Sequence, residues 1–282
     1  MSNFKTSAYP LSRSVKADLY DRAYAALQER SSDHKCAQAR GLLHDWGANR
    51  LMLGSTATVE AVLEPGRPAR PVLVSPRIVE RRKVSTVEGR AALIHSLAHI
   101  EFNAVNLALD AVYRFRDLPR EYYGDWIRIA AEESYHFTML RDHLVALGFD
   151  YGSFTAHNGL WEMAVKTAHD PLVRMALVPR LLEARGLDAA PTLIAKLKSC
   201  GDARGVEIMQ TIQRDEVEHV RIGNRWYAYF CAQRGVEPVA MFRRLLTEHG
   251  ARVRAPFDTA ARRRAGFTEE EMALLGELAS DV

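Results

Sequence analysis

Apolar residues recur at helical spacing through the middle of this chain, between about residues 85 and 235. The first run predicts a helix on one face of which apolar side chains repeat every three or four positions: Leu93, Leu97, Ile100, Ala104, Leu107 and Ala111. Ser85 and Glu88 are placed to form a capping box at its start, and Pro119 ends it. A second helix is predicted from about Arg120 to a left-handed cap near Gly148.

Residues 149–169 predict a different kind of connection, which is long, aromatic and contains a short helix at about 161–167. Two antiparallel neighbours need only a short loop, whereas bundles of the ferritin type have one long crossover between their two helical pairs. The position of this segment, between the second and third long helices, therefore predicts that architecture.

The third and fourth helices follow the crossover. Asp170 and Pro171 predict the start of the third helix, with the aspartate as cap and the proline in the first turn. Pro179 should kink this helix, and two further breaks are expected, at Gly186 and Pro191. The fourth helix is predicted from near Asp202 to Gly235.

The flanks of the chain read differently. Residues 14–30 predict an amphipathic helix, and residues 56–83, with four prolines among Arg and Val, predict an extended arm. Near the C-terminus, residues 268–271 predict a capping box that opens a short helix. We therefore expect an all-α fold, a ferritin-like four-helix bundle at 84–235, with an N-terminal helix and arm at 1–83 and a helical extension at 236–282.

Composition agrees with this expectation and limits the class of protein and its expected location. The 282 residues are 48% hydrophobic and 26% charged, with a net charge of +3, which suits a globular protein with a sizeable core. The first twenty residues lack the apolar centre of a signal peptide, and no run approaches the length of a membrane span. Three separated cysteines suggest reduced thiols. We expect a soluble, cytoplasmic protein without a membrane partner.

A Glu-x-x-His motif that occurs twice predicts a metal site. Glu133 with His136 and Glu216 with His219 are each one helical turn apart on one face, and single glutamates precede them by 32 and 33 residues. Four helices bearing Glu, Glu-x-x-His, Glu and Glu-x-x-His are the ligand set of a di-iron or di-manganese bundle. The predicted metal ligands are Glu101, Glu133, His136, Glu183, Glu216 and His219. The alternative is that each motif is a solvated helix face.

The register of the motif leaves an alternative open, because each copy has an additional acid in front. Glu132 and His136 also share a helix face, so Glu132 could replace Glu133 as a ligand. If Glu133 is the ligand, Glu132 and Asp215 become candidates for carboxylates that orient a ligand imidazole. Simple solvated acids are the other interpretation of both.

Several other residues invite a function. Tyr135 lies between ligands and is a candidate redox-active or hydrogen-bonding phenol, although an ordinary packed tyrosine is the alternative. His95 and His99 lie on a different face from Glu101, and we expect them to face the fourth helix or the arm. We expect Glu218 to be solvated or salt-bridged.

The crossover and the C-terminus hold two further candidate groups. The crossover residues could line an access channel or form an aromatic packing patch: His157, Trp161, Glu162 and His169. The arginines at 252, 254 and 262–264 could bind phosphate, nucleic acid or a carboxylate substrate, or could simply be solvated.

These segments resemble a bacterial ferritin-like family known as domain of unknown function number 455. The resemblance covers most of the chain, in the order found there, and includes four segments that carry predicted ligands: 98–101, 130–136, 178–188 and 214–226. It implies a ferritin-like bundle with metal at the six residues above, and it implies no reaction. A tRNA-modifying di-iron hydroxylase is a distant analogue at the level of fold alone.

The sequence thus predicts a di-iron oxidoreductase that activates dioxygen or peroxide, as a hydroxylase or oxygenase on an unknown small-molecule or macromolecular substrate. Manganese or a mixed Fe/Mn pair is the alternative to two iron ions. An external electron donor is expected, nucleic acid is one conceivable partner, and the oligomeric state is left open. The alternatives are a ferroxidase or peroxide-scavenging protein, and a non-catalytic helical interaction module with a structural metal.

Overall fold

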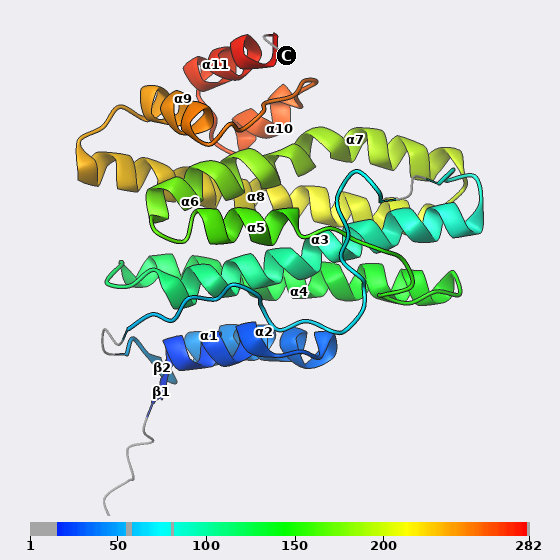
Figure 1. Ribbon diagram of the computed structural model, residues 1–282, viewed down its shortest axis with the longest axis horizontal. Coiled ribbons are helices and arrows are strands. Elements are labelled where there is room, and N and C mark those ends of the chain that lie inside the picture. Colours follow the sequence, from blue (N-terminus) through cyan, green and yellow to red (C-terminus); the bar gives the residue numbers. More distant parts are fainter. Residues whose placement is uncertain (1–15, 55–57, 80–81, 281–282) are drawn as a thin grey trace, which may run out of the picture.

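The computed structural model of the protein describes residues 16–54, 58–79 and 82–280 (Figure 1). Regular structure within these ranges is almost entirely helical, which confirms the predicted all-α class. The exceptions are two short parallel strands, β1 (Ala17–Asp18) and β2 (Leu51–Met52), which pair beside the first two helices. The polar segment 1–15, whose composition argued against a signal peptide, lies outside the described residues.

A bundle of long helices forms the centre of the molecule (Figure 1). Its members are α3 (Val87–Arg114), α4 (Arg120–Ala146), the composite third helix α6 (Pro171–Leu177), η1 (Val178–Glu183) and α7 (Ala184–Ser199), and α8 (Ala203–Arg234). The helix α3 packs along α4, α7 packs along α8, and α4 contacts α8. The crossover between α4 and α6 contains α5 (Gly159–Lys166), which covers part of α3.

The helix ends mostly follow the predicted signals. Asp202 accepts a hydrogen bond from the backbone of α8, and Gly235 ends that helix with a φ of 61°. The cap of α3 is Thr86, whose hydroxyl accepts from the amide of Gly89, so the prediction that Ser85 is the cap was wrong by one residue. Both side chains can accept such a bond, and only the backbone conformation selects between neighbours.

The third helix is irregular where Pro179 predicted it, but not at the two later positions. Residues 178–183 form a turn of π-helix, η1, because Pro179 has no amide hydrogen to donate and its ring displaces the preceding turn. The helix α7 then continues through Gly186 and Pro191 without a break, so that part of the prediction was wrong. Pro191 is exposed, and water can replace the one bond that its ring removes.

Helices on both flanks enlarge the bundle (Figure 1). The predicted N-terminal helix is α1 (Leu19–Gln28), and a second helix that we did not predict, α2 (Ser32–Gly47), packs on α4. The arm is extended, as predicted, and Leu73 bridges to Ala156 in the crossover. The C-terminal extension contains α9 (Pro238–Glu248), α10 (Thr259–Arg264) and α11 (Glu269–Ser280).

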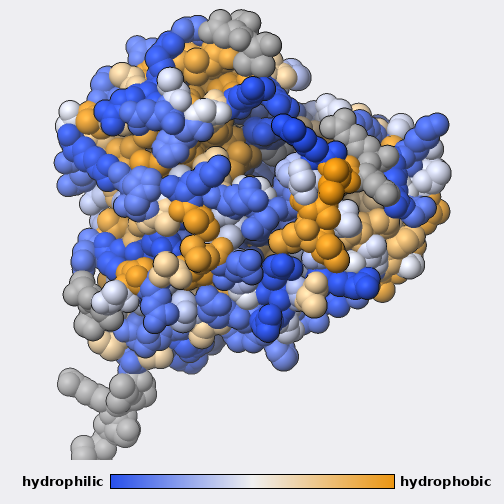
Figure 2. Space-filling model, viewed as in Figure 1, coloured by the Kyte–Doolittle hydropathy of each residue, from blue (hydrophilic) through white to orange (hydrophobic). Residues whose placement is uncertain are grey.

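Two groups of buried apolar residues fill the interior. The larger runs from Leu19 in α1 to Leu275 in α11, and the smaller lies at the other end of the bundle around Phe102, Phe137 and Ile208. The surface shown in Figure 2 is largely hydrophilic, with hydrophobic residues in separate groups. None of the described helices combines the length and the apolar character needed to cross a membrane. The division into segments 1–83, 84–235 and 236–282 stays a prediction.

Candidate metal centre

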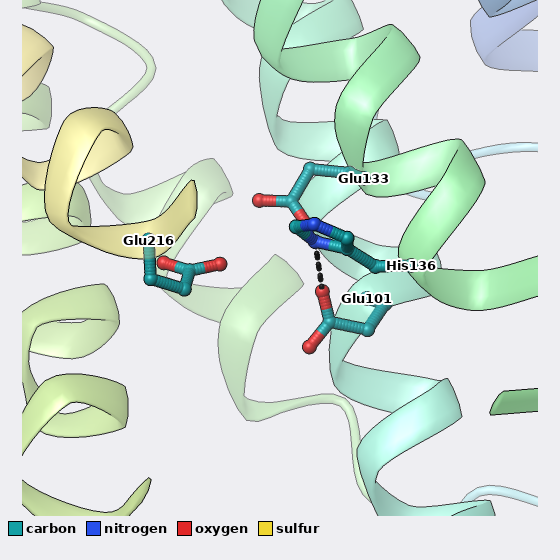
Figure 3. Close-up of side chains that lie close together, drawn as sticks. All are labelled: Glu101, Glu133, His136 and Glu216. Carbon is teal, nitrogen blue, oxygen red and sulfur yellow. Dashed lines mark hydrogen bonds and ion pairs between the residues drawn. The ribbon is translucent and has the colours of Figure 1, made fainter. Parts of the chain in front are cut away.

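Acidic and imidazole side chains meet between the two apolar groups. Glu101 comes from α3, Glu133 and His136 from α4, and Glu216 from α8. Each of these four offers a ligand atom, and the four atoms lie within 4.8 Å of one another (Figure 3). Such a group, three of whose members are buried, could hold a metal ion.

Glu133 lies at the centre of the cluster. Its Oε2 is 3.2 Å from Nδ1 of His136, and its Oε1 is 3.0 Å from Nδ1 of His219. Glu101 approaches the same nitrogen of His136 at 3.3 Å, and Glu216 approaches that of His219 at 3.5 Å. One carboxylate therefore stands between two imidazoles, each of which has a further glutamate beside it. This is the position that a carboxylate shared by two metal ions would occupy.

The two additional acids of the motif lie on the outer side of the imidazoles. Nε2 of His136 is 3.1 Å from Asp215, and Nε2 of His219 is 2.7 Å from Glu132. Each pair joins α4 to α8, so the acid in front of one motif binds the histidine of the other. An N–H at Nε2 that donates to these carboxylates leaves Nδ1 to face the cluster as an acceptor. Glu132 thus occupies the outer position and Glu133 the inner one.

Glu183 joins the centre from the end of η1, although it is not among the four closest residues. Its Oε2 is a buried atom without a hydrogen-bond partner in the described structure. Oε2 of Glu101 and Nδ1 of His219 are buried as well, but they lie at ion-pair distance from His136 and Glu133. Buried polar atoms without partners are costly. Glu183 therefore keeps an oxygen available for a further partner.

The carboxyl groups of the centre do not ionise alike. Burial and the charge of Glu133 raise the pKa of Glu101 well above its ordinary value, and the same two causes raise the pKa of Glu216. Burial and the charge of Glu216 raise the pKa of Glu183 to about 8. Burial also opposes ionisation of Glu133, but the charge of His219 outweighs it and lowers the pKa well below the ordinary value. Negative charge is thus concentrated on the central carboxylate.

The imidazoles respond to that charge. Burial disfavours the imidazolium form of His136, but hydrogen bonds with Asp215 and Glu101 outweigh it and raise its pKa to about 12. Burial likewise opposes protonation of His219, and the charge of Glu133 raises its pKa well above the ordinary value. A metal ion binds the deprotonated nitrogen, so binding here would compete with protons and release them.

Several candidates from the sequence lie away from this cluster. The side chain of Tyr135 is 54% exposed, so it does not enter the interior between the ligands or pack there. Glu218 pairs with Arg128 and Arg221, as expected. We expected His95 and His99 to face the fourth helix or the arm; the first alternative was wrong, because both are buried against the crossover.

The two histidines are held by crossover residues. The amide of Gly152 donates to Nε2 of His95 at 3.0 Å, and His99 bonds the hydroxyl of Tyr151 at 2.8 Å. His99 also contacts the backbone oxygen of His157 at 3.0 Å. The long crossover is thus anchored on α3 by imidazoles, a role that helical periodicity alone does not predict.

The proposed channel residues do not come together as a channel lining. Trp161 is 1% exposed and donates from its indole to the carbonyl of Leu63 at 2.8 Å, which fits the packing interpretation. His157, Glu162 and His169 are exposed. The structure therefore ties the crossover to the arm at this point.

Two of the five C-terminal arginines are paired with acids, and Arg252, Arg254 and Arg264 are exposed. Arg262 is buried and pairs with Asp188 at 2.7 Å, so the phosphate-binding or nucleic-acid-binding interpretation was wrong for this residue. Arg263 is paired with Glu269 at 2.6 Å. Neighbouring acids on other helices satisfy these charges, and the sequence spacing gives no sign of those acids.

Comparison with known proteins gives a family and no activity. A family model described as "Protein of unknown function (DUF455)" matches residues 28–273, a range that contains all six predicted ligands. A protein of Haemophilus influenzae described as uncharacterized is 48% identical over 213 residues, which cover 73% of this chain and 74% of that protein. No solved structure gives a significant match.

Proposed function

Because this chain belongs to the DUF455 family, whose description names no reaction, we propose its function from the metal centre: a di-iron oxidoreductase that activates dioxygen or peroxide. The observation that carries the proposal is the crosswise pairing of Asp215 with His136 and of Glu132 with His219. This pairing turns both Nδ1 atoms inward, toward buried carboxylates. A solvated helix face would not need such an arrangement.

The donor set fits two divalent ions of the iron or manganese type. Four inward glutamates carry four negative charges when ionised, which two divalent ions neutralise. One ion would take Glu101, His136 and the shared Glu133, and the other would take His219, Glu216 and Glu183 with the same shared group. Carboxylate oxygens with one imidazole per ion suit Fe or Mn better than the thiolate-rich sets of structural zinc sites.

The chain's own residues define the conditions at the site. Two iron ions, when bound, would supply the electrons that reduce dioxygen or peroxide. The buried apolar groups on either side exclude water from the ligands. Glu132 and Asp215, which are 35% and 23% exposed, keep the imidazoles oriented and connect the centre to the surface.

An oxygenase that acts on a separate substrate is the form of this function that we favour. The arm, the crossover and the C-terminal extension cover the bundle with residues that a minimal iron-oxidising bundle does not need. A ferroxidase or peroxide-scavenging protein is the second candidate. The partial exposure of Glu132 and Asp215 favours it, because acidic side chains between surface and centre suit the passage of metal ions.

Anaerobic loading with Fe(II), followed by exposure to dioxygen, tests the proposal. We expect two iron ions per chain and a transient change in near-ultraviolet absorption on oxidation. The double variant Glu133→Ala, Glu216→Ala should lose both. Glu218→Ala is the matched control, because this acid lies on α8 near the centre but pairs with surface arginines. Failure of the unmodified protein to bind two metals, or unchanged binding in the double variant, would refute the proposal.

A further inference from the structure

A buried arginine links the C-terminal extension to the π-helix that ends in Glu183. Arg180 lies inside η1 and is 2% exposed. Its Nη2 donates to Oε1 of Glu271 at 2.5 Å, and its Nη1 donates to Oδ1 of Asn224 at 2.9 Å. Glu271 belongs to α11 and Asn224 to α8, so one guanidinium joins three elements that are far apart in the sequence.

The partners of Arg180 are themselves fixed. The second carboxylate oxygen of Glu271 accepts from the amide of Thr268, and the hydroxyl of Thr268 accepts from the amide of Glu271, which is the predicted capping box. The side-chain amide of Asn224 donates to the carbonyl of Ala265 at 2.7 Å. The guanidinium is therefore held by groups that have little freedom of their own.

Aromatic rings complete the environment of this charge. The guanidinium carbon lies 4.3 Å from the ring centre of Tyr227, 4.6 Å from that of Phe242 and 5.0 Å from that of Phe267. Phe242 belongs to α9, and Phe267 lies two residues before α11. Contacts between a cation and ring faces strengthen when water is excluded. The extension and α8 together thus enclose Arg180 almost completely.

The π-helix approaches α8 closely at the same place. A Cβ atom added at Gly223 would lie 2.3 Å from Cβ of Pro179, so only glycine permits this approach. Gly223 follows His219 by one helical turn, and Glu183 ends η1 three residues after Arg180. Arg180 and Asn224 thus tie η1 to α8 beside the pair Gly223 and Pro179. The geometry of this contact between η1 and α8 therefore determines where Glu183 lies relative to Glu216 and His219.

We propose that the C-terminal extension positions the metal centre, with Glu271 and Arg180 as positioning residues that hold η1 so that Glu183 reaches its metal ion. The inference rests on the proposed two-metal function. It concerns one of the two ions, because Glu183 lies on the Glu216 and His219 side, whereas Glu101 and His136 belong to α3 and α4. Loss of the contact between Arg180 and Glu271 should therefore weaken one metal position more than the other.

Binding of Co(II), measured by visible absorption in competition with a chelator, tests the inference. The variants are Glu271→Gln, which has one acceptor oxygen where the carboxylate uses two, and Arg180→Lys, which keeps the charge but loses the fork. The control is Glu269→Gln, since Glu269 lies in the same turn of α11 and pairs with the exposed Arg263. We expect the affinity of one Co(II) position, the one that Glu183 would serve, to fall about 10- to 100-fold in both variants, with the other position and the control unchanged.

A second measurement separates positioning from a general loss of stability. Hydrogen exchange should show faster exchange of the amides of residue 178 and residues 180–183 in Glu271→Gln, while those of α3 and α4 keep their rates. Equal loss at both Co(II) positions, or two positions of unmodified affinity, would overturn the inference. Fewer than two Co(II) ions in the unmodified protein would instead refute the proposed function, and the positioning role would fall with it.

Discussion

The crosswise pairing of acids and imidazoles makes a quantitative prediction for Asp215 and Glu132. Glu132→Ala removes the oxygen that lies 2.7 Å from Nε2 of His219, and Asp215→Ala removes the oxygen 3.1 Å from Nε2 of His136. Neither acid is one of the six predicted ligands. Each substitution should free one imidazole to rotate and make its Nδ1 a poorer donor to a metal ion.

The structure also predicts which of the two substitutions lowers metal affinity more. Asp215 shares its charge with Arg214, which binds it at 2.9 Å, whereas Glu132 makes the shorter contact with its histidine. Loss of an outer carboxylate typically lowers metal affinity about 10- to 100-fold, or about 1.4 to 2.7 kcal/mol. We expect Asp215→Ala toward the lower end of this range and Glu132→Ala toward the upper end. Asp215→Asn, which keeps an acceptor oxygen, should lose less than Asp215→Ala.

Isothermal titration with Mn(II) or anaerobic Fe(II) measures these affinities, and Glu218→Ala again serves as the control on α8. Each single variant should weaken one metal position and leave the other near its original affinity. Unchanged affinity at both positions in Glu132→Ala would refute the reasoning, because it would mean that the orientation of His219 does not depend on this contact. Loss of both positions together would show that α4 and α8 had separated.

Three further predictions concern stability. Arg174→Met should lower the free energy of unfolding by about 1 to 3 kcal/mol in urea titrations, because it removes the buried donors to Asp110 and to the carbonyl of Ala164, while Asp110 keeps its pair with Arg114; an unchanged free energy would contradict this. Burial lowers the pKa of His95 to about 4, so the unfolded chain takes up a proton at this group as pH falls from about 6.5 and the native protein does not. Relative to His95→Gln, the unmodified protein should lose about 2 kcal/mol between pH 7.5 and 5, and parallel pH profiles would exclude this role. Gly223→Ala should displace η1 and destabilise the protein by about 1 to 3 kcal/mol, measured by thermal unfolding, and a neutral result would mean that η1 can move without cost.

Helix positions and the pairing of a glutamate with a histidine on one helix face follow from local rules. The spacing of Glu133 with His136, and of Glu216 with His219, places each pair on one helix face wherever the helix lies. Pro179 has no amide hydrogen, and Asp202 and Gly235 satisfy or end a helix locally. Such features depend on a few neighbouring residues, and so they can be read from the chain alone.

The helix α2 shows where local rules fail. Its interior face includes Lys35, whose side chain is completely buried and donates to the carbonyls of Leu27 at 2.9 Å and Gly66 at 2.6 Å. A charged residue at a core position interrupts the apolar pattern that would have predicted the helix. Its burial is possible because carbonyls from α1 and the arm and the side-chain oxygen of Asn106 on α3 accept its hydrogen bonds, and the sequence does not encode that meeting locally.

By itself, then, the sequence determined that the chain is all-α and which glutamates and histidines share a helix face, since helical periodicity acts over three or four residues. Only the tertiary structure decided that Glu132 binds His219, that Asp215 binds His136, and that Arg180 joins η1 to α11. The residues in these three contacts are 87, 79 and 91 positions apart in the sequence, respectively. Their geometry depends on how α4, α8 and the C-terminal extension pack, because packing and not sequence spacing sets which side chains face one another across helices.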